Sequence, residues 1–354
     1  MKIHLPVREA ILNRKTYEAP AEGRKGKTRL DFNENTTGCS EAARKALARL
    51  TAKEIAMYPE YEQATARIAR YFRVRPYEIA LTNGGDDALR VFFDTFVESG
   101  DSILICEPTF PMYRYYAEIA GAHVVALRYT PQMDFPVEAA LAALRKKPKV
   151  FFLANPNNPT GTLVEKTVLR KLLSVATHTV IVLDEAYSDF SGITGTPWIR
   201  HYPQLFVAKT FSKAAGMASL RLGVVIAQRD SLALVRRALP PYPVNAAALV
   251  AAIAAIEEKK ALIRYIADVK RLRNWLSQEL RNRGTQVFPS AGNFLLVDFG
   301  KQGPAIFTKL SKRNILVRER KELGPGFARI TIGTAKELQQ LLQSVPGNIE
   351  KPDE

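Results

Sequence analysis

The chain has 354 residues, of which 47% are hydrophobic and 24% are charged. This composition fits a soluble globular protein with a large buried core, and the length suggests two domains or one large domain with an appendage. No apolar stretch is long and uncharged enough to span a bilayer, and the first residues lack the apolar core of a secretory signal. Cys39 and Cys106 have no metal-ligand spacing, so a reducing cytoplasm is the expected location.

The formal net charge is +16, which raises the question of an anionic partner. One interpretation is a nucleic-acid-binding protein. However, the positive residues are scattered, with their densest cluster at residues 23–27, and the chain has neither a zinc-finger spacing nor an aromatic-basic ribonucleoprotein motif. We therefore expect anionic small molecules as partners, and neither nucleic acid nor a membrane.

Short β-rich runs alternate with helical patterns from residue 79 onward. The runs are 79–82, 102–108, 123–127, 149–156, 179–187, 205–211 and 223–228. The alternation predicts an α/β fold with a mainly parallel seven-stranded sheet between helices. Several runs are apolar on both faces, which is typical of buried parallel strands.

The pattern changes near residue 240, where the Pro-rich PPYPV breaks the chain. A long helical stretch follows from Asn245 to Arg283, and after it short β runs alternate with short helices. This predicts a smaller α+β domain. The expected division is an N-terminal arm with part of the small domain in 1–45, a large domain in 46–244, and the small C-terminal domain in 245–354.

Ligands of open parallel sheets bind at the carboxyl ends of the strands, so the loops there are the candidate sites. In NGGDDAL (83–89) two glycines turn the chain into a helix, whose free N–H groups would suit a phosphate. A plain turn with acidic capping explains the same residues. Residues 21–28 imitate a P-loop, but Ala21 stands where the first glycine should be and no strand precedes it, so a nucleotide site is rejected there.

Three further loops carry groups with chemical potential. NPNNPTG (155–161) is a rigid turn that would fix the amide of Asn158, and an X-Pro bond in it is a candidate for the cis form. In LDEAY (183–187), Asp184 ends an apolar strand, where a carboxylate needs a cationic partner unless it is simply exposed. Lys213, in KTFSKAAGMASLRLG (209–223), also follows a strand and could form a Schiff base.

These three loops together resemble the fold-type I pyridoxal-phosphate (PLP) enzymes of the class I and II aminotransferase group. The motifs stand in the order and at the spacing of that group, and the resemblance covers nearly the whole chain. It implies that Lys213 binds PLP and moves a proton between the substrate Cα and C4′ of the cofactor. Asp184 would pair with the pyridinium nitrogen, so that the ring acts as an electron sink.

The resemblance also implies the other cofactor contacts. Asn158 and Tyr187 would hydrogen-bond the phenolic oxygen, and Phe110 would stack on the ring. The implied phosphate ligands are Gly85, Asp86, Thr210, Ser212 and Arg221, the first two largely through backbone N–H groups. Tyr58 would reach the phosphate from the other subunit, so a homodimer is expected.

The arm at 7–40 resembles the start of histidinol-phosphate aminotransferases, in which it closes over the substrate. Tyr17 and Asn33 match positions there, and Arg318 and Arg329 match the positions at the substrate's anionic end. Arginine suits that end because its fork-shaped charge binds carboxylates and phosphates in pairs of hydrogen bonds. The implied reaction converts L-histidinol phosphate and 2-oxoglutarate into imidazole-acetol phosphate and glutamate, in histidine biosynthesis.

Several alternatives stay open. The chain departs from the usual pattern at 33–40, at Asp87, at Lys209 and at Pro111, without losing a catalytic group. A threonine-phosphate decarboxylase or an aromatic aminotransferase could use the same scaffold. A non-catalytic PLP-fold protein is disfavoured because Lys213 and Asp184 are both present. A metal site is not expected, since the four histidines have no metal-ligand spacing.

Overall fold

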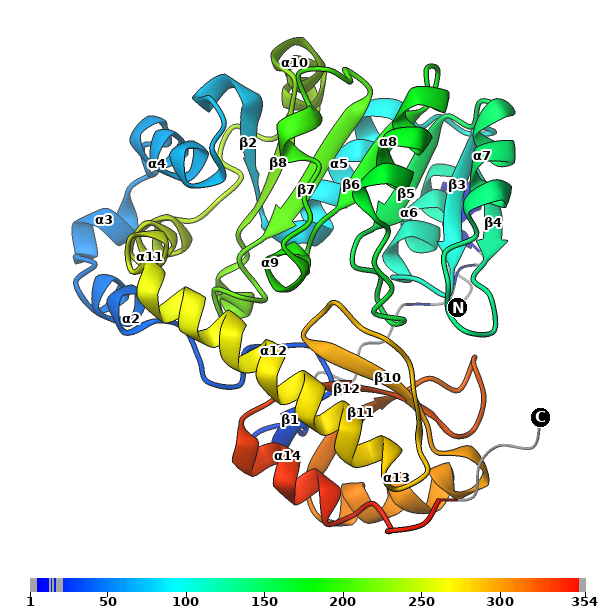
Figure 1. Cartoon of the computed structure of the whole chain (residues 1–354). Coiled ribbons are helices and arrows are strands. Elements are labelled where there is room, and N and C mark those ends of the chain that lie inside the picture. Colours follow the sequence, from blue (N-terminus) through cyan, green and yellow to red (C-terminus); the bar gives the residue numbers. More distant parts are fainter. Residues whose placement is uncertain (1–4, 13, 15, 17–21, 350–354) are drawn as a thin grey trace.

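The computed structural model describes residues 5–12, 14, 16 and 22–349. A large α/β unit and a smaller α+β unit lie one above the other, and the long helix α12 (Lys259–Arg281) runs obliquely along both (Figure 1). Within the described ranges, no helix is both long enough and apolar enough to cross a membrane.

All seven predicted strands form one sheet in the large unit. Their order is β2 (Ile79–Thr82), β8 (Gly223–Ala227), β7 (Leu205–Thr210), β6 (Val180–Asp184), β5 (Val150–Ala154), β3 (Ser102–Glu107) and β4 (His123–Arg128). Only β8 runs antiparallel to its neighbours, so the prediction of a mainly parallel sheet is confirmed. The four central strands β8, β7, β6 and β5 are almost entirely buried, which explains why their sequences are apolar on both faces.

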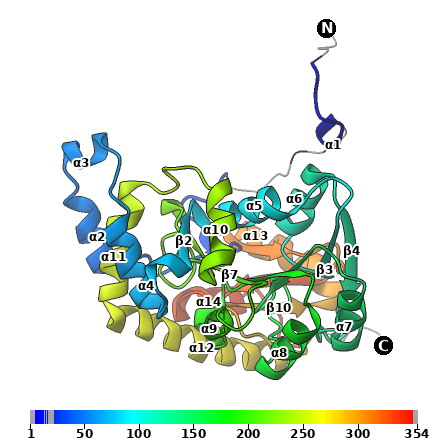
Figure 2. The same ribbon diagram turned by 90° about the horizontal axis from the view of Figure 1, so that it is seen from above.

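Helices cover both faces of this sheet. One face packs on α5 (Gly84–Phe96), α6 (Met112–Ala120) and α10 (Arg229–Ala238). The opposite face packs on α4 (Glu62–Phe72), α7 (Val137–Arg145), α8 (Lys166–Val175) and α11 (Ala246–Glu257). The remaining helices of this unit are short or peripheral: α1 (Glu9–Leu12), α2 (Glu41–Ala48), α3 (Ala52–Ala56) and α9 (Ser188–Ser191). Of these, α1 lies at the margin of the unit, next to α6 (Figure 2).

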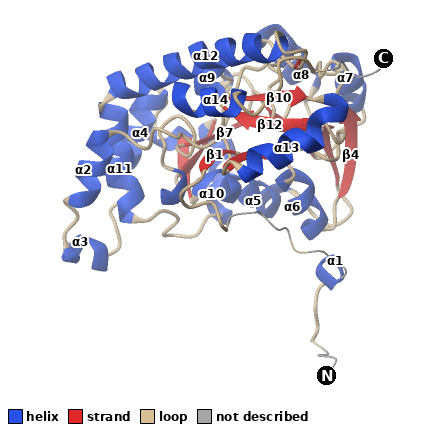
Figure 3. Cartoon of the chain, turned by 90° about the horizontal axis from the view of Figure 1, so that it is seen from below, coloured by secondary structure: helices blue, strands red, loops and turns tan. Residues whose placement is uncertain are grey.

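The small unit is built on a five-stranded sheet. Its order is β1 (Thr28–Leu30), β11 (Ile315–Glu319), β12 (Phe327–Thr331), β10 (Phe294–Asp298) and β9 (Gln286–Val287), and its helices are α12, α13 (Gly303–Lys312) and α14 (Ala335–Leu342) (Figure 3). Because β1 pairs in parallel with β11, a strand near the start of the chain completes a sheet whose other strands come from residues 286–331.

The helical stretch predicted between Asn245 and Arg283 is two helices, which divide at Glu258. The first, α11, packs its Ala-rich surface on α2 and α4 of the large unit, whereas the second, α12, also contributes to the small core. No Gly or Pro marks the break, which results from packing on two different cores. The division of the chain at 45 and 244 stays a prediction, and the packing of α11 favours a second boundary near Glu258.

Gly223 at the start of β8 lies directly against the loop that follows β2. A Cβ atom added to Gly223 would lie 2.5 Å from the carbonyl carbon of Gly84, and backbone cannot yield as a flexible side chain can. We therefore expect Gly223→Ala to lower the free energy of unfolding by about 2 kcal/mol, seen as a lower urea midpoint. Gly347→Ala is the matched control, because a Cβ there meets no atom within 4 Å; equal midpoints for the two variants would contradict the account.

Candidate active site

Two adjoining cavities, of about 210 and 930 Å³, open at the carboxyl ends of β5, β6 and β7. They share several lining residues, namely Phe32, Asp86, Phe110, Asn158, Tyr187 and Lys213. The smaller cavity is lined mainly by the large unit, while the larger one also reaches β11 and β12 of the small unit. The candidate site therefore lies between the two units, where the parallel strands end.

Lys213 follows β7 and faces both cavities. Its Nζ donates a hydrogen bond to the backbone carbonyl of Phe32 at 3.0 Å and lies 5.7 Å from the ring centre of Tyr187. Within the described ranges no carboxylate forms an ion pair with this amine, so nothing anionic has to be displaced before it reacts.

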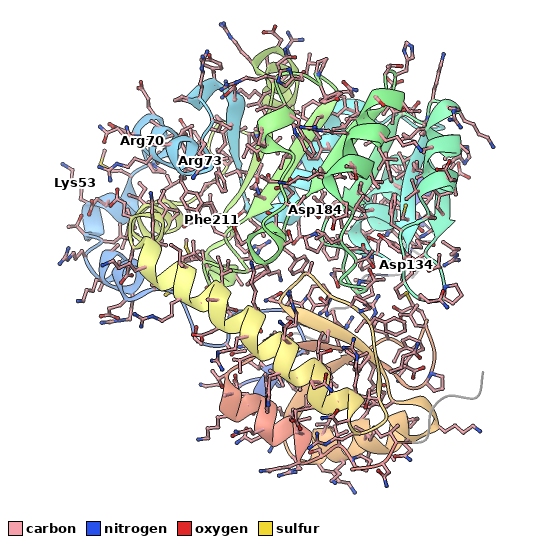
Figure 4. All side chains as sticks on the ribbon, in the orientation of Figure 1. Lys53, Arg70, Arg73, Asp134, Asp184 and Phe211 are labelled. Carbon is pink, nitrogen blue, oxygen red and sulfur yellow. The ribbon has the colours of Figure 1, made fainter. Side chains whose placement is uncertain are left out.

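Asp184 ends β6, the neighbouring strand, and lines the smaller cavity (Figure 4). One carboxylate oxygen accepts the backbone N–H of Ala186 at 3.0 Å, and the other accepts the hydroxyl of Tyr113 at 2.7 Å. Burial raises the pKa of Asp184, while the two hydrogen bonds act in the opposite direction by stabilising the charged form. A cation entering the smaller cavity would therefore meet a carboxylate that is already oriented.

The N-terminus of α5 and the loop after β7 form a possible anion cradle. Gly84 has a φ of +85°, which turns the chain so that α5 begins beside Arg221. Arg221 Nη2 bonds to Asp86 Oδ2 at 3.1 Å, and Thr210 Oγ1 donates to Ser212 Oγ at 2.9 Å. The free N–H groups at the start of a 13-residue helix, two hydroxyls and a guanidinium are all donors that suit a phosphate.

Asn158 is held by a buried arginine of the small unit. Arg329 donates to Asn158 Oδ1 and also to the carbonyl of Asp31. Desolvation lowers the pKa of Arg329 to about 10. The peptide bonds before both prolines of the 155–161 loop are cis, which confirms the expectation of a cis bond there. Arg329 thereby links the Asn158 loop to the segment after β1.

The other predicted substrate residues are Asn33, Arg318 and Tyr17, and they differ in burial and in whether they line a cavity. Asn33 is fully buried, and its side chain bonds to the Tyr187 hydroxyl at 3.0 Å and to Thr331 at 3.2 Å. Arg318 lies opposite Arg329 in the β11–β12 ladder and lines the larger cavity. Tyr17 lies outside the described residues. The substrate roles of these residues stay predictions. The hydrogen bond from Asn33 to the Tyr187 hydroxyl indicates that Asn33 holds Tyr187 in place.

Two site residues were missed in the sequence, although each had a signal. Arg320 lies just beyond the end of β11 and two residues after Arg318, and both line the larger cavity, as the alternation of an extended chain would place them. Tyr113 stands three residues after Phe110 at the start of α6, and its ring contacts that of Phe110 edge to face at 5.9 Å. The sequence offered no sign that the Tyr113 hydroxyl reaches Asp184.

The arm enters the same region. Arg14 forms an ion pair with Glu118 of α6 at 2.8 Å and lies 4.0 Å from the ring centre of Tyr115. Arg14 and Thr16 both line the larger cavity. The segment just before Tyr17 therefore borders the candidate site, as an arm that covers a substrate must.

Tyr58 lines neither of the two cavities, and Lys209 lines the smaller one but has its charge paired within the fold. The side chain of Tyr58 is 75% exposed and stacks on Tyr242 with ring centres 4.1 Å apart, so it does not reach this chain's own site. The Nζ of Lys209 is bonded to the buried carboxylate of Glu185 and to Ser188 Oγ. Lys209 is thus neutralised within the fold, in contrast to Lys213.

The residues present fit PLP. Fold-type I PLP enzymes use three groups: an amine, here without an ion pair to a described residue, a carboxylate on the next strand, here partly buried, and a phosphate cradle at a helix N-terminus. The fold and the site thus define this class.

Comparisons with known proteins agree with that class. The family model described as aminotransferase class I and II matches residues 25–345. Histidinol-phosphate aminotransferases from Geobacillus thermodenitrificans and Geobacillus sp. WCH70 are 35% and 32% identical over 330 and 327 residues, covering 90% of this chain and 88% of each relative. The crystal structure of histidinol-phosphate aminotransferase from Sinorhizobium meliloti with PLP superposes with a TM-score of 0.84 at 25% identity, over 90% of each chain. The chain belongs to the class I and II aminotransferase family and is a PLP-dependent enzyme.

Replacing Asp184 by Asn should stabilise the cofactor-free protein at neutral pH. Because burial raises the pKa of Asp184 above its value in the unfolded chain, the ionised carboxylate opposes folding at pH 7. The Asp184→Asn protein should melt about 2 °C or more above the parent at pH 7. The gap should close as the pH falls toward the ordinary Asp pKa of about 4, where both states bind the proton. Melting curves of PLP-free protein test this, and a lower melting temperature for the variant at pH 7 would contradict it.

Proposed function

We propose that the chain catalyses the transamination of L-histidinol phosphate with 2-oxoglutarate. The observation that carries this is that the larger cavity is lined both by Lys213 and by arginines of the small unit, Arg318 and Arg329 among them. The names of the relatives point to the same substrate. Two features support the proposal: the side chains of the smaller cavity fit PLP, and the adjoining larger cavity is lined by arginines.

PLP, when bound, supplies the electron sink that makes the Cα–H bond of an amino substrate acidic. In this proposal Lys213 would hold the cofactor and, once released from it, would move a proton between the substrate Cα and C4′ of the cofactor. The negative charge of Asp184 would stabilise the protonated form of the ring nitrogen. Asn158 and Tyr187 would bond the phenolic oxygen. Their side chains are held from the small unit, by Arg329 and Asn33 respectively.

The wall of the larger cavity suits a substrate with an anionic end. The arginines that line it are Arg14, Arg114, Arg128, Arg318, Arg320 and Arg329. Some are engaged by acids, since Arg14 pairs with Glu118 and Arg114 with Glu107. Arg318 has no described ion pair and stands across the ladder from Arg329. A phosphate monoester and the side-chain carboxylate of glutamate could bind there in turn, because a guanidinium bonds both kinds of oxygen pair.

A homodimer with Tyr58 serving the partner's site is the second element of the proposal. Tyr58 and Tyr242 form an exposed stacked pair, and Ile55 and Met57 beside them are also exposed, at 69% and 59%. Large apolar side chains gathered on one surface indicate a covered interface. In the proposed dimer, the phenol of Tyr58 would reach the phosphate cradle of the other subunit. In its own chain, Tyr58 lines neither cavity.

The substrate is tested by a half-reaction screen with PLP-loaded protein. L-histidinol phosphate, aromatic amino acids and phosphothreonine are added separately, and the cofactor spectrum is followed. We expect the fastest conversion to the pyridoxamine form with histidinol phosphate. Fastest conversion with an aromatic amino acid, or release of carbon dioxide from phosphothreonine, would replace the proposal with one of the two alternatives.

The shared site is tested by complementation between two inactive variants. Tyr58→Ala and Lys213→Ala proteins are unfolded together, mixed in equal amounts and refolded. About half of the dimers then contain one chain of each variant. In each of these, one site combines an intact Lys213 with an intact Tyr58 from the other chain, so activity should return to about a quarter of the parent's. Each variant refolded alone is the control, and a mixture no more active than its parts would contradict a shared site.

A further inference from the structure

Tyr113 contacts both Asp184 and the predicted ring-stacking residue, Phe110. Its hydroxyl donates to Asp184 Oδ2 at 2.7 Å, and its ring meets that of Phe110 edge to face. The side chain is completely buried at the start of α6, and its ring stacks on Phe152 of β5 at 5.4 Å. Packing therefore fixes the direction of its hydroxyl.

The surroundings of Asp184 show why this hydroxyl matters. Within the described part of the chain, Asp184 has no cationic side chain as a partner; its two bonds come from Tyr113 and the Ala186 N–H. Nearby Asp86 and Glu185 add like charge, which opposes ionisation. Each hydrogen bond to a charged acceptor stabilises it more than a bond between neutral groups does. Tyr113 thus supplies one of two interactions that offset burial and like charge.

We propose that Tyr113 is a positioning residue that keeps the Asp184 carboxylate ionised and directed into the cavity, where it pairs with the ring nitrogen of PLP. This inference rests on the proposed roles of Asp184 and Lys213. Because each carboxylate oxygen accepts one bond from the protein, each keeps a lone-pair direction for the cofactor. Tyr113 lines the smaller cavity beside Asp184, and in this proposal its hydroxyl acts through Asp184 rather than on the reacting atoms.

Tyr113→Phe isolates the hydroxyl, since the ring and its contacts with Phe110 and Phe152 are retained. Without the bond, Asp184 binds a proton more readily and takes it from the ring nitrogen. The less positive ring then releases the proton at Lys213 less readily. The pH midpoint of the bound cofactor's absorption change should rise by about one unit, and the affinity of the PLP-free protein for PLP should fall about tenfold.

Two comparisons separate positioning from packing. Tyr129→Phe removes another buried phenol, one with no hydrogen bond to a described residue, and should leave the midpoint and the affinity unchanged. In an Asp184→Asn background, Tyr113→Phe should cost no further PLP affinity, because the carboxylate through which it acts is gone.

Three results would overturn the inference. The first is a Tyr113→Phe protein whose cofactor absorption changes at the same pH midpoint as in the parent, and the second is a Tyr129→Phe protein with an equal shift of that midpoint. The third is a Tyr113→Phe substitution that lowers PLP affinity as much in the Asp184→Asn background as in the parent. A parent protein that takes up no PLP would instead refute the proposed function, so the two failures are distinguishable.

Discussion

The Asp184 carboxylate is a partly buried charge that has no cationic side chain as a partner among the described residues, and much of the site is organised around it. Burial raises its pKa, and the fold compensates with a phenol and a backbone N–H rather than with a lysine or an arginine. An ion pair would have satisfied the charge permanently. Hydrogen bonds to neutral donors leave the charge available to a cationic ring that enters the cavity.

The two lysines that line the same cavity as this carboxylate show how the same residue type is given different tasks. Lys209 lies inside β7 and is neutralised by Glu185, so it stabilises the junction between strand and helix. Lys213 lies just beyond the strand, where its amine is bonded only to a carbonyl among the described residues. Lys209, which has a structural role, and Lys213, the proposed reactive lysine, are therefore only four positions apart in the sequence.

The small unit acts on the cofactor region indirectly. Arg329 fixes Asn158, and Asn33 fixes Tyr187, through bonds that cross from one unit to the other. A movement of the small unit would thus alter the groups proposed to contact the phenolic oxygen. The arm residue Arg14, bonded to α6, encloses the same cavity from the large unit.

The sequence predicted the parts of this arrangement that depend on local pattern. The seven strands were evident because each is a short apolar run, and Lys213, Asp184 and Asn158 were candidates because each stands at or shortly after the end of a strand. Long-range partners were not: Tyr113 and Asp184 are 71 residues apart, and Asn33 and Thr331 are 298 apart. The division of 245–283 into two helices also escaped prediction, since it depends on which core each half packs against.

The most direct test of the account is the identity of the residue that binds PLP covalently. The PLP-loaded protein is reduced with borohydride and digested, and the labelled peptide is found by mass. The account predicts a single label on Lys213 and none on Lys209. A label on another lysine, or a protein that binds PLP without any reducible bond, would contradict it.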